Sequence, residues 1–132
     1  MASVSMDTSE LDQLAAELAD AYSRAQPKIV ATTTKAALNI KNGARNNIQG
    51  QITGRYLPHY PRSIDFDLSV SASGVDADIG PRSDMPQGGM GPGVEYGSSN
   101  APPLPHLIPA FEDEVPTWMD FLADALAESV LP

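Results

Sequence analysis

The spacing of apolar residues changes once along this chain, and that change most constrains the fold. From residue 11 to residue 48, apolar side chains recur every three or four residues, which is the period of an amphipathic helix. From residue 64 to residue 79 they alternate with polar ones, which is the period of a half-buried strand. Helices therefore precede strands, and we expect an α+β domain.

Two apolar stripes are expected on the N-terminal helices, with Pro27 between them. Proline either begins a second helix at its first position or kinks one long helix, and we predict two helices. The second stripe is built of small side chains, which suits close approach of another helix or a sheet. The stripes are Leu11, Leu14, Ala15, Leu18 and Tyr22, followed by Ile29, Thr33, Ala36, Ala37, Ile40, Ala44 and Ile48.

A β-hairpin is predicted next, with strands at 64–70 and 75–79 and a tight turn at Ser73-Gly74. A third short strand is predicted at Val94–Tyr96. The expected fold is thus a small antiparallel sheet of three to four strands packed against two N-terminal helices and a C-terminal helix. A sheet this small has open edges, which another subunit often completes.

The rest of the chain is expected to form one loop and one helix within a single domain, 1–132. The segment Gly80–Gly93 holds five glycines and three prolines, so we predict a flexible loop without a packed element. A helix is predicted from Phe111 to Leu131, and Pro116 is a candidate for its first turn. Residues 1–7 are expected to be mobile.

Charge is distributed unevenly along the chain. The net charge is −9, yet seven of the eight basic residues lie between Arg24 and Arg62, where no acid occurs. One alternative is that such a block contacts nucleic acid. The other is that it faces solvent or packs against the acidic flank of another copy. We favour the second alternative because the strong negative net charge weakens general DNA affinity. The predicted basic face is Lys28, Lys35, Lys41, Arg45, Arg55 and Arg62.

The motifs that would indicate catalysis, a cofactor or a metal are missing from the sequence. Asp65 and Asp67, like Asp76 and Asp78, could hold a hard cation, but strand alternation already explains them as a solvent face. His59 lies in a Pro-rich connector, as His106 does, and packing or hydrogen bonding explains both histidines better than catalysis. No GxSxG elbow or phosphate loop is present. We therefore predict a non-enzyme without cofactor or metal.

The sequence also bears on where the chain resides. No stretch approaches the roughly 20 apolar residues that cross a bilayer. The acidic N-terminus lacks the basic-then-apolar order of a signal peptide, and the chain has no cysteine. A soluble protein made inside the cell, with no membrane partner, is expected.

The segment Gly93–Ala110 has the features of a docking segment. A predicted strand runs into a polar turn, a Pro-stiffened lead and an apolar anchor at Leu107–Phe111. It contains no nucleophile–base pair and no metal cage. The anchor packs either on its own core or in a pocket of a neighbouring copy, and these alternatives differ only in which chain supplies the pocket.

Two motifs in this segment carry a family resemblance. Val94–Gly97 (VEYG), a Pro-rich turn and Pro105–Ala110 (PHLIPA) lead into the last helix. This run resembles the tail-completion (head–tail connector, or neck) proteins of long-tailed bacteriophages, and the order of helices, strand pair and Gly-rich loop is also similar. His106-Leu107 departs from the family, whose members often carry an aromatic residue there, so the pocket partner is left open.

The resemblance implies a virion structural protein without catalysis, made in the bacterial cytoplasm and located at the neck. It implies a hexameric ring between the head connector proteins and the tail terminator or tail tube, with a channel for DNA. DNA would pass without sequence recognition, and the loop 80–93 would project to a neighbour or into the channel. The implied subunit-interface residues are Glu95, Tyr96, Gly97, Leu107, Ile108 and Phe111.

Two alternative functions stay open from the sequence. The chain could be a tail terminator, which occupies the adjacent tier with a related small α+β design. It could also be a small DNA-binding adaptor that uses the segment from Arg24 to Arg62 on duplex DNA.

Overall fold

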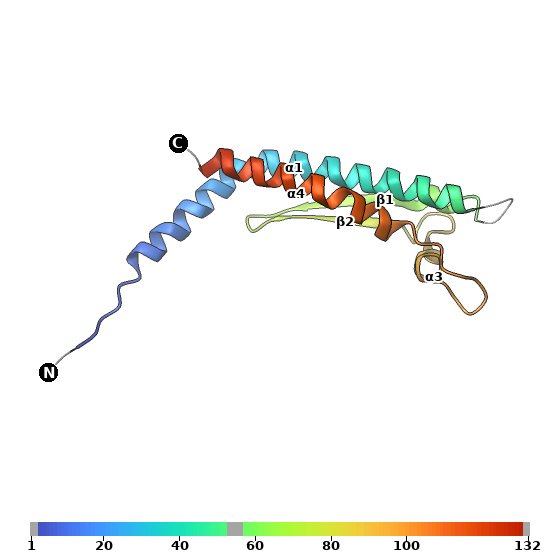
Figure 1. The fold of residues 1–132 in the computed structure, drawn as a ribbon, viewed down its shortest axis with the longest axis horizontal. Coiled ribbons are helices and arrows are strands. Elements are labelled where there is room, and N and C mark those ends of the chain that lie inside the picture. The colour runs from blue at the N-terminus through green and yellow to red at the C-terminus, as the bar shows by residue number, and fades with distance from the viewer. Residues whose placement is uncertain (1–2, 53–56, 131–132) are drawn as a thin grey trace.

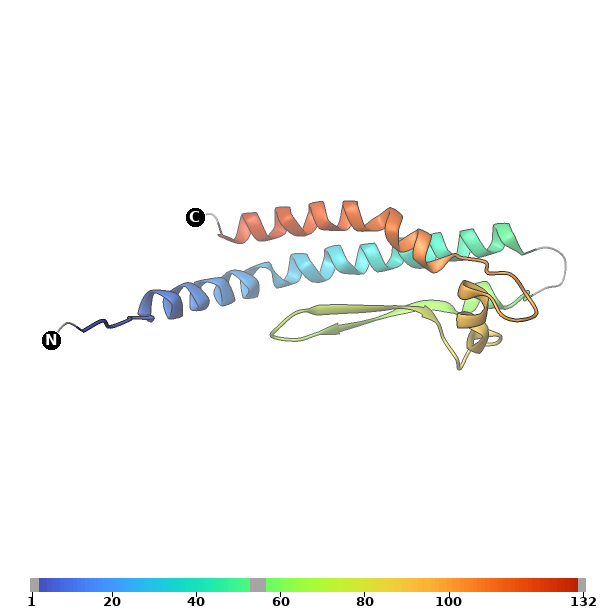
Figure 2. The same cartoon turned by 60° about the horizontal axis from the view of Figure 1, so that its bottom comes forward.

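The computed structural model of the chain describes residues 3–52 and 57–130. α4 and the β1–β2 hairpin both pack along α1, on different sides of it in the view of Figure 2, and Phe111 of α4 also lies beside β2. The described part of the chain is therefore a mixed helix-and-sheet structure, as the change of apolar period predicts. In chain order the elements are α1 (Ser9–Gln51), α2 (Tyr60–Ser63), β1 (Ile64–Val70), β2 (Val75–Pro81), the 3-10 turn η1 (Gly88–Met90), α3 (Gly91–Tyr96) and α4 (Leu107–Val130).

The prediction of two N-terminal helices is wrong, because α1 is a single helix of 43 residues with Pro27 inside it. Proline removes one helical hydrogen bond and pushes against the preceding turn, which bends a helix without ending it when both flanks are good helix formers. Figure 1 shows such a change of direction between the blue first part of α1 and its cyan remainder. The alternative of one kinked helix is the correct one.

The β-hairpin forms as predicted, with β1 and β2 antiparallel and Val70 paired with Val75 beside the turn. Asp67 and Asp78 face each other across the strands and are exposed, and Asp76 is exposed on the same side. The acidic solvent face of the hairpin is therefore confirmed. Among the described residues the sheet has two strands rather than three or four.

The predicted third strand at Val94–Tyr96 is wrong, since these residues end the helix α3. Three residues are too few to distinguish a strand from a helical turn by period. The helix is favoured by Pro92 in its first turn, where the missing N–H is not needed. Val94 and Glu95 are both buried, which alternation in a strand at a sheet surface would not give.

The Gly-rich segment also differs from the prediction of a loop without packed elements. It contains the last residues of β2, the turn η1 and the beginning of α3. Gly88 is buried, and a Cβ atom there would overlap the carbonyl oxygen of Arg82. Glycine is therefore needed at this position because two backbone segments approach each other closely.

The core lies where the second half of α1 meets α2, β1, α3 and the start of α4. Every member of the predicted second stripe is buried, so that prediction is confirmed. Within the described residues no helix is both long and apolar enough to cross a membrane. The core cluster consists of Ile40, Ala44, Ile48, Leu57, Tyr60, Ile64, Val94 and Ala110.

The first part of α1 lies outside this core. We call Ser9–Asp20 the N-terminal arm, and every residue in it is exposed. Its leucines, Leu11, Leu14 and Leu18, are 64%, 50% and 56% exposed. Both views show the arm extending beyond the ends of α4 and the hairpin (Figures 1 and 2). In the described residues the part of the first predicted stripe that lies on the arm, from Leu11 to Leu18, is therefore an apolar helix face without a covering element, whereas Tyr22 is half-buried at the hairpin tip.

Candidate interaction site at the start of helix α4

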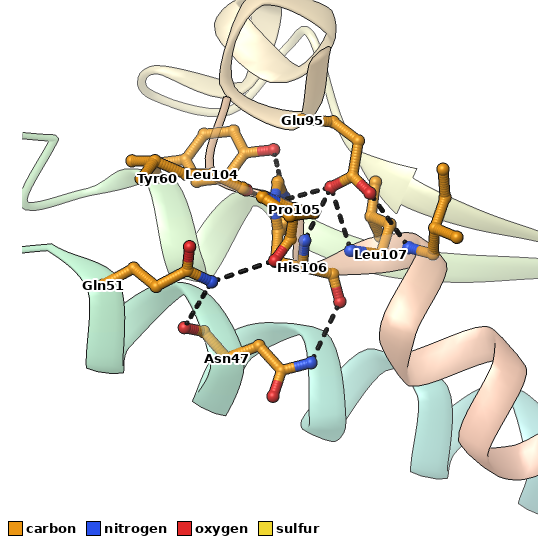
Figure 3. A network of polar contacts seen from close by, with 9 residues as sticks. Asn47, Gln51, Tyr60, Glu95, Leu104, Pro105, His106 and Leu107 are labelled. Atoms are coloured by element: carbon orange, nitrogen blue, oxygen red, sulfur yellow. Dashed lines mark hydrogen bonds and ion pairs between the residues drawn. The ribbon is translucent and has the colours of Figure 1, made fainter. Parts of the chain in front are cut away.

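The carboxylate of Glu95 forms the N-terminal cap of α4. Its Oε2 accepts hydrogen bonds from the backbone N–H groups of His106 and Leu107, at 2.8 and 3.0 Å. Its Oε1 accepts one from the N–H of Ile108 at 3.0 Å. A negative charge at this end also interacts favourably with the helix dipole. A side chain from α3 therefore satisfies donors that would otherwise lack partners (Figure 3).

The imidazole of His106 continues this network toward the core. Its Nδ1 lies 2.8 Å from both Glu95 Oε2 and the carbonyl oxygen of Leu104, which are both acceptors. Nδ1 must therefore carry the proton, and in the neutral ring Nε2 is free to accept. The hydroxyl of Tyr60 lies 2.7 Å from Nε2 and donates to it when the ring is neutral, and the two rings meet edge-on with centroids 5.3 Å apart.

Two amide side chains on α1 fix the segment that leads into α4. Asn47 Nδ2 donates to the carbonyl oxygen of His106 at 3.2 Å. Gln51 Nε2, one turn later, donates to the carbonyl oxygen of Pro105 at 2.9 Å. Figure 3 shows α1 approaching the network from the side opposite Glu95. The entry to α4 is thus held from both sides.

The pKa values of the network follow from its burial. Burial raises the pKa of Glu95, but three backbone N–H groups and the imidazole of His106 outweigh burial and leave it below its ordinary value. Burial, together with the negative charge of Glu95, raises the pKa of Tyr60 to about 12. Glu95 is therefore ionised and Tyr60 neutral over a wide pH range around neutrality.

The polar groups of Tyr60, His106 and Glu95 in the network are buried and hydrogen-bonded to one another. Tyr60 and His106 have no exposed surface, and Glu95 is 5% exposed. No buried side-chain nitrogen or oxygen in the described residues lacks a hydrogen-bond partner. A general acid or base needs access to the proton that it transfers, and the side chains of Tyr60 and His106 have no contact with solvent. For His106 the prediction of hydrogen bonding at a turn is confirmed.

Beside the network lies an exposed apolar depression of about 440 Å³. We call it the α3–α4 groove. Tyr96 is 72% exposed and Ile108 is 43% exposed, so both present apolar surface to solvent. The groove is lined by Pro81, Ser83, Gly88, Gly89, Gly91, Pro92, Glu95, Tyr96, Leu107 and Ile108.

The structure brings four of the six predicted interface residues together at this groove and separates two from it. Glu95, Tyr96, Leu107 and Ile108 line the groove. Gly97 lies in the turn after α3 with a φ of 85°, and a Cβ there would lie 2.9 Å from the nitrogen of Pro103. Phe111 lies further along α4, 50% exposed, beside Val75 and Ile79 of β2.

Three of the six residues of the predicted basic face make polar contacts within the chain. Lys28 pairs with Glu128 of α4, and Lys41 lies 3.5 Å from Asp65 of β1. Arg45 donates to the carbonyl oxygen of Ile64 at 2.7 Å. In residues 3–52 and 57–130 the ion pairs do not include Lys35 or Arg62. Arg55 lies outside the described residues.

Of the two aspartate pairs of the hairpin, Asp65 and Asp67 contact basic side chains. Arg82 lies 3.3 Å from Asp65 and 2.7 Å from Asp67. A backbone N–H of Phe66 lowers the pKa of Asp65, with further help from Lys41 and Arg82 against the effect of burial. The described part of the chain contains no group of three or more His, Cys, Asp or Glu side chains placed to hold a metal ion.

Sequence reasoning missed three members of the network: Tyr60, Asn47 and Gln51. Asn47 and Gln51 are four residues apart and therefore lie on one face of α1, which is a weak indication that they act together. Tyr60 lies in a Pro-punctuated connector and is fully buried. Nothing in the local sequence indicates that it meets a histidine 46 residues later in the chain.

Comparisons of the chain with protein-family models, with curated proteins and with solved structures find no match. The functional conclusion therefore depends on the residues and the geometry described above.

Proposed function

We propose that this chain is a non-enzymatic structural protein of a bacteriophage virion. In this proposal it is a tail-completion subunit that forms a hexameric ring at the neck. The ring joins the head connector proteins to the tail terminator or tail tube and leaves a channel through which DNA passes.

The observation that carries this proposal is the gathering of predicted docking residues at one exposed apolar groove. Tyr96 and Ile108 are large, exposed and adjacent in the α3–α4 groove. Exposed apolar surface of this kind typically marks a protein–protein contact. Glu95 fixes both walls of the groove, because it belongs to α3 and caps α4. The groove is therefore held in a defined shape before a partner arrives, which lowers the entropic cost of binding.

The pairing of the basic residues supports an assembly role over a DNA-binding adaptor. A stripe that tracks phosphates needs free cationic groups on one face. Lys28 and Lys41 pair instead with carboxylates of α4 and β1, and Arg45 donates to backbone carbonyls. Binding DNA through these groups would compete with the contacts that they make within the chain.

The direct experiment is to image purified virions of the phage that encodes the chain. A ring of this protein between the head connector and the tail would support the proposal. A ring one tier lower, at the end of the tail tube, would identify it as a tail terminator instead. A protein absent from the virion would contradict the proposal.

A variant pair tests the groove itself. Tyr96→Ser with Ile108→Ser removes exposed apolar surface from the groove and is expected to reduce virion assembly by about tenfold or more. Val70→Ser is the matched control, since Val70 is 50% exposed at the far end of the hairpin. Normal assembly of the double variant, with an unchanged fold by circular dichroism, would rule out docking at this groove.

A further inference from the structure

The leucines of the N-terminal arm continue the buried face of α1. Leu11, Leu14 and Leu18 are followed at spacings of three and four residues by Ala21, Ala25 and Ile29, which are buried. Residues at these spacings lie on one side of a helix. The same apolar face is therefore covered after residue 20 and uncovered before it.

The elements that cover this face are α4 and the β1–β2 hairpin, and both end close to the junction between the arm and the rest of α1. The end of α4 is marked by Arg24, whose guanidinium donates to the carbonyl oxygen of Ser129 at 2.9 Å. The tip of the hairpin is marked by Tyr22, whose hydroxyl donates to the carbonyl oxygen of Ser71 at 3.1 Å. Because the arm is continuous with the rest of α1, it cannot fold back on its own body. Within the described residues the chain therefore supplies no cover for the arm.

The charge of the arm disfavours pairing between two arms. Residues 3–20 contain five acids and no base: Asp7, Glu10, Asp12, Glu17 and Asp20. Two such helices side by side would place like charges along the whole contact, which is unfavourable. The remainder of α1, residues 21–51, has the opposite composition, with five bases and no acid.

A second groove, between α1 and α4, matches the arm in polarity and charge. This α1–α4 groove has a volume of about 240 Å³, and its apolar walls include Ala31, Ala36, Trp118 and Phe121. Lys35 lies on its α1 side and Glu114 on its α4 side. In the described residues Glu114 accepts a hydrogen bond from Asn39, whereas the ion pairs do not include Lys35.

We propose that the N-terminal arm of one copy docks in the α1–α4 groove of the next copy, with Leu14 and Leu18 against Trp118 and Phe121 and Glu17 beside Lys35. This inference rests on the proposed ring, for which it identifies a subunit contact.

The two flanks of the arm fit the two sides of the groove. On a helix with 100° per residue, Glu10 and Glu17 lie along one flank of the leucine stripe. Ala15 and Ala19 lie along the other flank. The acidic flank therefore faces Lys35, and the uncharged flank faces Glu114. In this arrangement Glu17, the acid between Leu14 and Leu18, lies on the side of the groove away from Glu114.

A contact between two different surfaces joins copies head to tail, which closes into a ring or continues as a filament. The arm spans about 18 Å, at 1.5 Å per residue. One face of so short a helix buries less area than the roughly 800 Å² per partner of a stable interface. It is therefore expected to act together with the α3–α4 groove rather than to hold two copies alone.

Disulfide trapping in the full chain tests this contact, because the natural sequence has no cysteine. The variant carries Leu14→Cys and Thr117→Cys, two exposed positions on the arm and the groove. Lys35 and Thr117 line the same groove. Within one chain Leu14 lies about 30 Å from Lys35 along α1, because the two residues are 21 positions apart. A disulfide requires Cα atoms within about 7 Å, so any bond must join two copies.

The expected result under mild oxidation is a ladder of covalent oligomers up to the size of the ring. Each single-cysteine variant should remain unlinked, and so should the control that pairs Leu14→Cys with Ser99→Cys at the opposite end of the molecule. Covalent dimers of Leu14→Cys alone would show arm–arm pairing and overturn the proposal. Absence of a ladder in the double variant, at concentrations where the protein is assembled or at its solubility limit, would also overturn it.

Charge reversal gives an independent measurement of the same contact. Glu17→Lys in the double-cysteine background should lower the cross-linked fraction about fivefold, and adding Lys35→Glu should restore it. Lack of rescue would contradict the pairing of Glu17 with Lys35. Rings at the neck without a ladder would refute the arm contact alone, whereas a protein absent from the virion would refute the proposed function.

Discussion

The end of the molecule where α3 meets α4 and the end formed by the N-terminal arm differ in how their groups find partners. At the first end, Glu95, His106 and Tyr60 are buried and each is hydrogen-bonded within the chain. At the second, three leucines lie exposed on a helix that nothing in the described chain covers. The comparison shows that the buried groups of the first end are satisfied within the chain, whereas the leucines of the second end have no cover in the described residues.

The sharpest test of this comparison removes the carboxylate of the first end. Glu95→Ala leaves three backbone N–H groups and the Nδ1–H of His106 with fewer acceptors in a buried site. We expect the free energy of unfolding to fall by about 3 kcal/mol, because buried polar groups without partners are costly. Urea denaturation monitored by circular dichroism measures it.

Two further variants separate the cap from general effects of mutation. Glu95→Gln retains one acceptor oxygen and should lose about 1–2 kcal/mol. Glu112→Ala, at an exposed position of α4, should stay within about 0.5 kcal/mol of the natural protein. If Glu95→Ala unfolds at the same urea concentration as Glu112→Ala, the network does not stabilise the first end.

The ionisation of Glu95 predicts a smaller, pH-dependent effect at the same end. Its folded pKa lies below the ordinary value of 4.5, so the folded state binds this proton less readily than the unfolded state. The stability from Glu95 is therefore fully present above about pH 4.5 and is lost as pH falls through the lowered folded pKa.

Urea midpoints measured from about pH 7 to about pH 3 test this prediction. Glu95→Gln should show a shallower loss of stability in acid than the natural protein. A slope should remain in the variant, because Asp7 and Asp65 also have lowered pKa values. Identical slopes for the two proteins would mean that Glu95 is not the group that titrates.

The first end shows why part of the fold could not be predicted from the sequence. Apolar period correctly predicted the buried second half of α1, the hairpin and the existence of a C-terminal helix, since each is long enough to show its period. The predicted start of that helix was wrong, because α4 begins at Leu107 and contains Pro116 in its interior rather than in its first turn. The cap by Glu95 joins residues 11 to 13 positions apart, and the contact of Tyr60 with His106 spans 46. No local pattern encodes these contacts, and the three residues Val94–Tyr96 were too few to reveal α3.

The arm shows a different limit of sequence reasoning. The spacing of Leu11, Leu14 and Leu18 correctly indicates a helix with one apolar face. The same spacing continues into residues that are buried, so the pattern does not reveal whether the face has a cover. That depends on where α4 and the hairpin end relative to α1, which is a property of tertiary structure. The sequence likewise does not decide whether Pro27 begins a second helix or lies inside one continuous α1.

The smallest effect on stability is expected at the arm, and it is the result that would sharpen the comparison most. Leu14→Ser with Leu18→Ser changes side chains that are already half exposed, so the free energy of unfolding of the isolated subunit should change by less than about 0.5 kcal/mol. The same variant should weaken self-association at least tenfold, as measured by sedimentation over a range of concentrations, because two leucines leave the contact. Ala16→Ser, on the opposite face of the arm, is the matched control and should change neither quantity. A large loss of subunit stability would mean that the arm belongs to the folded core, whereas unchanged association would mean that its apolar face is not a contact between copies.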